Sequence, residues 1–292
     1  RGALAELPDA ATAQCFTSRL LSLSVQDSLA LLQATHPSVS AALLDGQMYE
    51  DLPSRSLLTR CLDTHCAAAV AGWPAEDTLH QLRNSAAHPS RQQVLALMQA
   101  IDSEQSLEVC EDILSQDPVL AYRFLLYTNS AALGLRSGID SLRRGLVMLG
   151  YGMLQRWLSD QLPHADSEVD LHPVRAAMVM RAQLTQRLIE AGIGQDLQRE
   201  VYLCGLFSQL DALLGDPLAD SLRRLPLSER IYQAIISKSG PYAASLALAE
   251  ALETPDGSAI RALCETHQME LESVNRNLLR MLRDCSSASR PG

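Results

Sequence analysis

The chain has 292 residues, enough for one large domain or two ordinary ones, and 47% of them are hydrophobic. Aromatic residues make up only 4%, so leucine, alanine and valine must fill the interior, and leucine and alanine favour helices. The net charge of −10 argues against direct nucleic-acid binding through general charge attraction. Every apolar run is shorter than the roughly 18 residues of a membrane span, and no secretory pattern opens the chain, so we expect a cytoplasmic protein without membrane contact.

The N-terminal part of the chain carries apolar positions at helical spacing. Two helical patches are predicted within residues 1–35, and a further helix across residues 43–71 is broken near Pro53. This part contains no catalytic motif and no glycine-rich phosphate-binding loop. We expect a helical N-terminal region of unknown role.

A polar stretch at residues 76–89, which ends in Asn-Ser-Ala-Ala-His-Pro, is typical of a linker. It places a domain boundary near residue 88, between a region at 1–88 and a second domain at 89–292. The sequence begins with Arg rather than Met, so we expect a fragment of a longer protein whose upstream domain would supply a signal.

Seven cysteines lie far apart in the chain, without a C-x-x-C pair. Their odd number and wide spacing favour free buried thiols in a reducing compartment over a disulfide framework. Cys61, His65 and Cys66 are the nearest approach to a metal-binding cluster. Because no second pair follows at zinc-finger spacing, we favour a structural role for these three residues.

The stretch at residues 117–150 predicts a helical hairpin. Asp117 can cap a helix whose first turn holds Pro118, and apolar positions then follow at i, i+4 and i+7. Asn129 and Ser130 end this helix, because their side chains compete for backbone hydrogen bonds. A second helix begins after residue 141 and carries three leucines at the same spacing; it ends at Leu149-Gly150.

Helical patterns continue to the C-terminus. We expect a helix with Trp157 on its buried side at residues 152–162, a long helix opened by Pro173, and another across residues 196–214. Short helices are predicted from there to residue 285. Period-2 alternation is almost absent, so the sequence predicts an all-α fold.

Three runs within this domain resemble the signature of the HDOD family, a bacterial regulatory domain related to HD phosphohydrolases. They are DPVLAYRFLLYTNSA, the isoleucine of GID, and LRRGLVMLG, in which Asp117-Pro118, Asn129-Ser130 and Leu149-Gly150 fall at the family's spacing. Arg156-Trp157 and the run GLFSQLDALLGDPLADSLRRLPLS are similar to HDOD domains that sit behind a cyclic-diguanylate phosphodiesterase-like (EAL) domain. The resemblance covers roughly residues 88–252 and implies a multi-helix HD-domain-like bundle.

The metal chemistry of HD phosphohydrolases is missing from this sequence. These enzymes hold divalent metals with histidines and an adjacent His-Asp pair, but none of the seven histidines here is followed by Asp. Where that pair would lie, the chain has Ser208 and Gln209, and the upstream ligand would fall near Ala177. The resemblance therefore implies an HD scaffold with its metal site erased, and we expect no catalytic residue, metal or cofactor.

Four arginines are candidates for contacts with a phosphorylated or acidic partner: Arg136, Arg143, Arg144 and Arg156. The alternative, which we favour, is a solvated face that balances nearby carboxylates. For Asp117, Asn129 and Ser130 we likewise favour structural roles over catalysis, because each has a helix-capping or helix-ending task.

These observations favour a non-enzymatic module for output or scaffolding in bacterial signal transduction, of the response-regulator type. It would act through contacts with other signalling proteins or with an upstream sensory or receiver domain. A partner segment would dock between the hairpin at 117–150 and the helices at 173–214. Two alternatives stay open: a metal-dependent phosphohydrolase acting on a nucleotide second messenger, and a protein that binds such a nucleotide without cleaving it.

Overall fold

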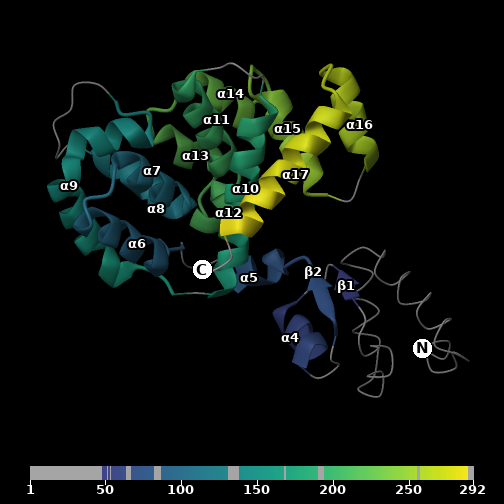
Figure 1. Cartoon of the computed structure of the whole chain (residues 1–292), viewed down its shortest axis with the longest axis horizontal. Coiled ribbons are helices and arrows are strands. Elements are labelled where there is room, and N and C mark those ends of the chain that lie inside the picture. The colour runs from purple at the N-terminus through teal and green to yellow at the C-terminus, as the bar shows by residue number, and fades with distance from the viewer. Residues whose placement is uncertain are drawn as a thin grey trace, which may run out of the picture. The chain divides into compact units, whose positions relative to one another are not determined.

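The computed structural model describes residues 48–50, 52, 54–63, 67–81, 87–130, 138–167, 169–189, 194–254 and 257–288 (Figure 1). They belong to two compact units, one within residues 1–83 and one within residues 84–292. The helical patches expected within residues 1–35 lie outside the described residues. So do Cys15, His65, Cys66 and Arg136.

The first unit contains a small parallel sheet. Strand β1 (Met48–Glu50) pairs with β2 (Ala69–Ala71), and helix α4 (Arg55–Asp63) lies between them in the chain, as a parallel connection requires. Helix α5 (Ala75–Gln81) follows. The prediction of helix across residues 43–71 is therefore wrong at both strands, because a strand of three residues is too short to show an alternating pattern.

The named elements of the second unit are helices, which confirms the all-α prediction. The two three-residue strands of the first unit are too short to alter this fold class. Its first elements are α6 (Arg91–Asp102), α7 (Leu107–Ser115), α8 (Pro118–Thr128), α9 (Leu142–Gln161) and the short 3-10 turns η3 (Leu162–His164) and η4 (Val169–Leu171). There follow α10 (His172–Leu188), α11 (Gln195–Phe207), α12 (Leu210–Leu214), α13 (Leu218–Arg223), α14 (Glu229–Ile235), α15 (Ala243–Leu252), α16 (Gly257–Thr266) and α17 (Leu271–Ala288). Among the described residues, the helices lack the combination of length and apolar character that crossing a bilayer demands.

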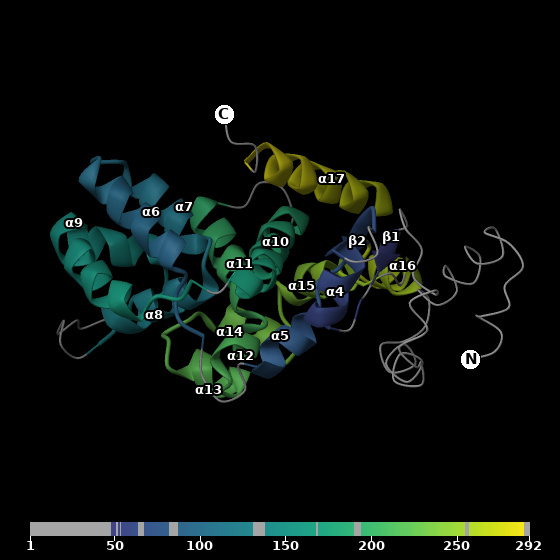
Figure 2. The same cartoon turned by 90° about the horizontal axis from the view of Figure 1, so that it is seen from below.

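Helix α10 lies between two hydrophobic clusters of this unit. Figures 1 and 2 show α6 to α9 at one end, α10 and α11 in the middle, and α15 to α17 at the other end. The larger cluster joins α6–α9 to α10–α15 and includes Val179 and Ala182 of α10. The smaller one joins α10 to α15–α17 and includes Leu184 and Leu188. Helix α10 thus contributes to both cores, as does α15 through Leu246 and Leu248.

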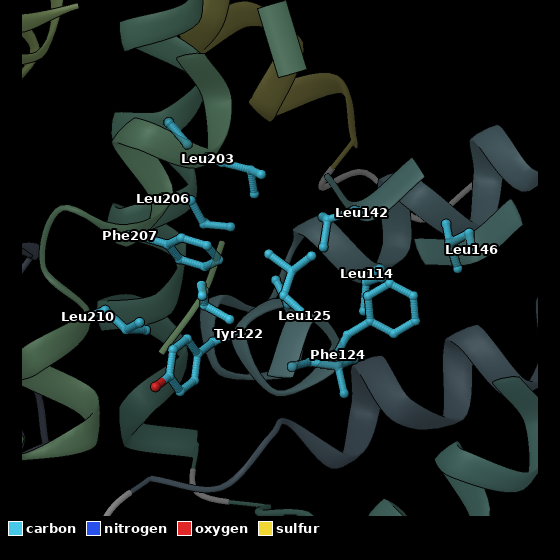
Figure 3. Close-up of a cluster of buried hydrophobic side chains, with 14 of the residues drawn as sticks. Leu114, Tyr122, Phe124, Leu125, Leu142, Leu146, Leu203, Leu206, Phe207 and Leu210 are labelled. Atoms are coloured by element: carbon cyan, nitrogen blue, oxygen red, sulfur yellow. The ribbon is translucent and has the colours of Figure 1, made fainter. Parts of the chain in front are cut away.

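The predicted apolar stripe of α8 lies at the centre of the larger cluster. Figure 3 shows Phe124 and Leu125 of this helix pointing into the cluster, and the Tyr122 ring meets Phe207 of α11 edge to face, with centroids 6.3 Å apart. The ring of Trp157 lies 5.5 Å from that of Phe124 and stacks on Tyr127 at 5.8 Å. Trp157 is therefore a core residue.

Gly150 breaks helical geometry at the place where the second helix of the hairpin was predicted to end. This residue adopts φ 64° and ψ 172° inside α9, a conformation that interrupts the helix and that glycine reaches without steric cost. Leu149 is buried just before it. The helix resumes at once, so the two predicted helices are the halves of one interrupted helix.

The single helix predicted across residues 196–214 is wrong, because the structure divides it into α11 and α12. Gln209 leaves helical geometry with φ −130° and ψ 25°, and the Ser208 hydroxyl donates back to the Gly205 carbonyl at 2.8 Å. The break falls at the two residues that stand in place of a His-Asp pair.

Candidate functional site

Asp117 is a structural junction. Its side chain is fully buried; Oδ1 accepts from the backbone N–H groups of Val119 at 2.8 Å and Leu120 at 3.1 Å, which confirms the predicted cap of α8. Pro118 occupies the first turn as predicted. Oδ2 accepts from the N–H of Ser90 at 2.5 Å and so joins α8 to the start of α6.

A buried arginine lies against this junction. Nη2 of Arg175 on α10 donates to the His88 carbonyl at 2.5 Å, and Nη1 lies 3.8 Å from Asp117 Oδ2. Asp166 Oδ2 is 3.9 Å from Nη2. These contacts hold α10 against the residues that precede α6, although the buried Nε of Arg175 makes no hydrogen bond within the described part of the chain.

Asn129 and Ser130 end α8, as expected. The Asn129 amide donates to the carbonyls of Leu125 at 2.7 Å and Ile139 at 2.8 Å, and its Oδ1 accepts from the N–H of Ile139 at 2.7 Å. The Ser130 hydroxyl is buried and makes no side-chain hydrogen bond within the described part of the chain. This geometry fits the structural role favoured for Asn129, whereas the side-chain hydrogen bond expected of Ser130 is absent from the described residues.

The candidate arginines have carboxylate neighbours in two of the described cases. Arg143 pairs with Glu108 and lies 4.0 Å from Glu111, and Arg144 pairs with Asp140 at 2.8 Å. Arg156 is exposed on the second half of α9. The pairs of Arg143 and Arg144 favour charge balance, and the role of the four arginines in partner binding stays a prediction.

A second polar centre surrounds Arg181. Ala177 is exposed, and the residue of α10 that faces the α11–α12 break is Arg181, one helical turn further. Nη1 of Arg181 donates to Ser208 Oγ at 3.1 Å. With the Gln209 amide oriented so that its oxygen faces the donors, that oxygen accepts from Nη2 at 2.8 Å and from Nη1 at 3.2 Å.

Two carboxylates complete this centre from the end of α15. Nε of Arg181 donates to Glu253 Oε1 at 2.5 Å, and Nη2 donates to the other oxygen of the same carboxylate, so the pair is bidentate. Glu250 Oε1 lies 3.9 Å from Nη1 and 3.0 Å from Lys238 Nζ. Arg181 is only 5% exposed, and every N–H of its guanidinium has an acceptor.

This arrangement does not fit the divalent metal of an HD phosphohydrolase. A hydroxyl and a neutral amide are weak ligands, and a fixed guanidinium between them repels a second cation. Among the described residues, no group of three or more His, Cys, Asp or Glu side chains is placed to hold a metal ion. Sequence reasoning missed Arg181, although an arginine within the apolar face of a long helix signals a buried partner.

A polar groove lies between α7, the start of α9, α10 and α11. Its volume is about 640 Å³. In the wall of the groove, Glu111 Oε1 accepts a hydrogen bond from Arg199 Nε at 3.0 Å. Burial raises the pKa of the Glu111 carboxyl. Its other lining residues include Asp112, Leu142, Gln183, Gln186, Gln198 and Tyr202. The groove lies mainly between α7 and the helices α10 and α11, and Leu142 is its one lining residue from the stretch at 117–150, so the docking place expected between that stretch and the helices at 173–214 stays a prediction.

The second unit is an all-helical bundle in which Arg181 of α10 bonds to the α11–α12 break and to the end of α15. Residues 86–215 match the model of the HDOD domain. This part of the chain belongs to the HDOD domain family, as its motifs predicted.

Two relatives each match more than half of the chain. The chain is 27% identical over 173 residues to the Cyclic di-GMP phosphodiesterase CdgJ of Vibrio cholerae, covering 59% of this chain and 40% of that protein. It is 23% identical over 193 residues to the Uncharacterized protein YuxH of Bacillus subtilis, covering 65% of this chain and 46% of that one. The match thus spans less than half the length of either relative.

One solved structure has a similar fold. The MmoQ response regulator from Methylococcus capsulatus superposes with a TM-score of 0.55 and 17% identity, over 67% of this chain and 99% of that chain. At this level of identity the likeness concerns the fold alone.

Proposed function

We propose that the protein is a non-enzymatic module of bacterial signal transduction that acts through protein–protein contacts. The observation that carries this proposal is the position of Arg181, whose guanidinium bonds to Ser208, Gln209 and Glu253 where an HD enzyme would hold its metal. A site filled by a paired cation leaves no place for the metal that would activate water.

The comparisons support a role in signalling. One relative is named a cyclic di-GMP phosphodiesterase and one structure a response regulator, so the similar domain occurs in proteins named for signalling. Because the match covers 40% of the phosphodiesterase, that activity need not belong to the shared part. Four described cysteines, Cys61, Cys110, Cys204 and Cys264, are buried free thiols, which fits the reducing cytoplasm.

The groove between α7 and α10–α11 is the proposed contact surface. Its glutamines Gln183, Gln186 and Gln198 can each donate and accept hydrogen bonds, so they can pair with the backbone of an extended or helical peptide. Leu142 offers an apolar contact at one wall. An upstream sensory or receiver domain would control access to this surface.

A hydrolysis assay tests the absence of catalysis. Purified protein is incubated with cyclic di-GMP and Mn²⁺ or Mg²⁺, and the products are separated by chromatography. We expect the nucleotide to stay intact. Metal-dependent hydrolysis at a stoichiometric metal content would overturn the proposal in favour of a phosphohydrolase. A nucleotide-dependent rise in melting temperature without hydrolysis would favour the nucleotide-binding alternative.

Substitution in the groove tests the contact surface. Full-length wild-type protein is used to capture partners from an extract of the native host. The amount of each partner recovered is then compared between the wild type and Gln186→Arg. We expect this variant to lose the partner. Asn275→Arg introduces the same charge at an exposed position of α17 and serves as the control. Equal recovery with both variants would place the contact elsewhere.

A further inference from the structure

We propose that the guanidinium of Arg181 is a built-in replacement for a bound cation, and that its surroundings form a cation site in their own right. The site consists of the hydroxyl of Ser208, the amide oxygen of Gln209 and the carboxylates of Glu250 and Glu253. Its ligand is a planar guanidinium ion. This inference concerns the chemistry of the site and goes beyond the proposed role in signalling.

The geometry of the acceptors selects this ion. Glu253 receives two parallel N–H groups on its two oxygens, the arrangement that a guanidinium presents and an ammonium does not. Gln209 accepts from both Nη1 and Nη2, and Ser208 accepts from Nη1. The acceptors therefore serve all three nitrogens of the guanidinium.

The charges of the site also require a cation. Lys238 pairs with Glu250, with its Nζ 3.0 Å from the carboxylate. Glu253 instead pairs with Arg181 through a bidentate contact. Removing the guanidinium would leave a carboxylate beside the buried Ser208 without that counter-charge. The side chain of Glu253 is 37% exposed, so a small ion from solvent can reach the site from this side.

The position of the site gives the cation a mechanical role. Arg181 lies on α10 close to residues of both cores. Val179 and Ala182 pack in the larger core, and Leu184 packs in the smaller one. Its bonds reach the α11–α12 break on one side and the end of α15 on the other. The cation thus fastens the two cores to each other, as a structural metal would.

Chemical rescue tests this inference. Arg181→Ala removes the cation, and we expect the melting temperature of the otherwise complete protein to fall by about 10 °C. Guanidinium chloride at low millimolar concentration should then raise the melting temperature of the variant, whereas the same concentration of sodium chloride should not. Arg181→Lys keeps the charge without the planar fork and should recover only part of the loss.

A second arginine serves as the matched control. Arg187 lies on the same helix and pairs with Asp284 at 2.9 Å, but both side chains are about one-third to one-half exposed. Arg187→Ala should lose little stability and gain none from guanidinium. A rescue that is equal in both variants, or absent in Arg181→Ala, would overturn the inference.

The wild-type protein is used to test whether a metal ion binds at this site. We expect neither EDTA nor Mn²⁺ to change its melting temperature, because the guanidinium already fills the site. A stoichiometric metal that stabilises the wild type and competes with guanidinium in Arg181→Ala would contradict the replacement. If Arg181→Ala does not fold, Arg181→Met retains the buried stem and the same rescue is measured on it. The partner and hydrolysis assays above are independent of these readouts.

Discussion

The side-chain amide of Asn129 and the main chain of Ile139 form a two-way hydrogen-bonded pair. Asn129 Oδ1 accepts from Ile139 N–H at 2.7 Å, and Nδ2 donates to the Ile139 carbonyl at 2.8 Å. The same amide nitrogen bonds the Leu125 carbonyl at the end of α8. A single side chain thereby joins the C-terminus of α8 to a residue ten positions further on, just before α9.

Asn129→Ala should destabilise the protein by about 2 kcal/mol, because it leaves the partly buried N–H and carbonyl of Ile139 without these partners. Ser130→Ala is the neighbouring control and should be neutral, since the Ser130 hydroxyl is buried without a side-chain hydrogen bond. Urea unfolding followed by circular dichroism gives both values. An unchanged stability of Asn129→Ala with lost partner binding would instead identify Asn129 as a contact residue.

Gly205→Ala should cost about 1 to 3 kcal/mol, because a Cβ at this position would lie 2.6 Å from the Ala182 Cα and force α10 and α11 apart. Gly152 in α9 is the matched control, since a Cβ there meets no atom within 4 Å. Gly152→Ala should stabilise the protein by about 0.5 kcal/mol through helix propensity. Thermal unfolding that ranks the two variants in the opposite order would refute the close packing of α10 on α11.

Glu111 and Glu108 should give opposite pH dependences of stability. Burial, the largest cause, raises the pKa of Glu111, so the folded state holds its proton more tightly than the unfolded state. The stability contribution is present below the unfolded pKa and is lost as the pH rises through the folded pKa. Glu111→Gln keeps an acceptor for Arg199 and should therefore be more stable than the wild type at neutral pH, with the difference shrinking in acid.

For Glu108, the hydrogen bond from Arg143 lowers the pKa to about 2 from 4.5. Its stability contribution is present above the unfolded pKa and is lost as the pH falls through the folded pKa. Glu108→Gln should therefore be less stable than the wild type at neutral pH, and the two should converge near pH 2. Chemical unfolding at a series of pH values measures both curves, and parallel curves would contradict both assignments.

Cys204 should resist alkylation in the folded protein. Burial raises the pKa of its thiol to about 12, so the reactive thiolate is scarce at pH values near 8, the ordinary range for alkylation. Cys285 on α17 is partly exposed and should react first. Iodoacetamide labelling followed by peptide mass spectrometry, with and without urea, compares the two. Rapid labelling of Cys204 without urea would show that α11 opens readily.

Local rules were enough to predict most helix boundaries in the second unit. The cap of α8 by Asp117, the bond of Asn129 to the Leu125 carbonyl and the break at Gly150 lie within one turn of backbone, so they follow from sequence position alone. The bonds of Asp117 to Ser90 and of Asn129 to Ile139 reach beyond that turn and were not predicted. The break at Ser208-Gln209 was not predicted. Besides the local bond of Ser208 to the Gly205 carbonyl, this break receives a hydrogen bond from Arg181, 27 residues away, and no local pattern contains such a contact.

The polar centre shows the same division between local and distant causes. The resemblance indicated that Ser208 and Gln209 replace metal ligands, but it placed the opposing residue at Ala177, one helical turn from Arg181. Helical periodicity defines which residues share a face, and only the packing of α10 on α11 determines which residue meets the break. Glu253, the other partner, lies 72 residues from Arg181 and beyond the recognised motifs.

The distance between Arg181 and Glu253 along the chain bears on how this domain can be transplanted. The match to the family model ends at residue 215, yet the counter-charge of Arg181 and the apolar cover of Leu184 and Leu188 come from α15 to α17. A domain cut at Gly215 and fused to another protein would leave Arg181 without the Glu253 carboxylate and would expose Leu184 and Leu188 to solvent. A portable version of the domain must extend through Met281, the last residue of α17 in the smaller core.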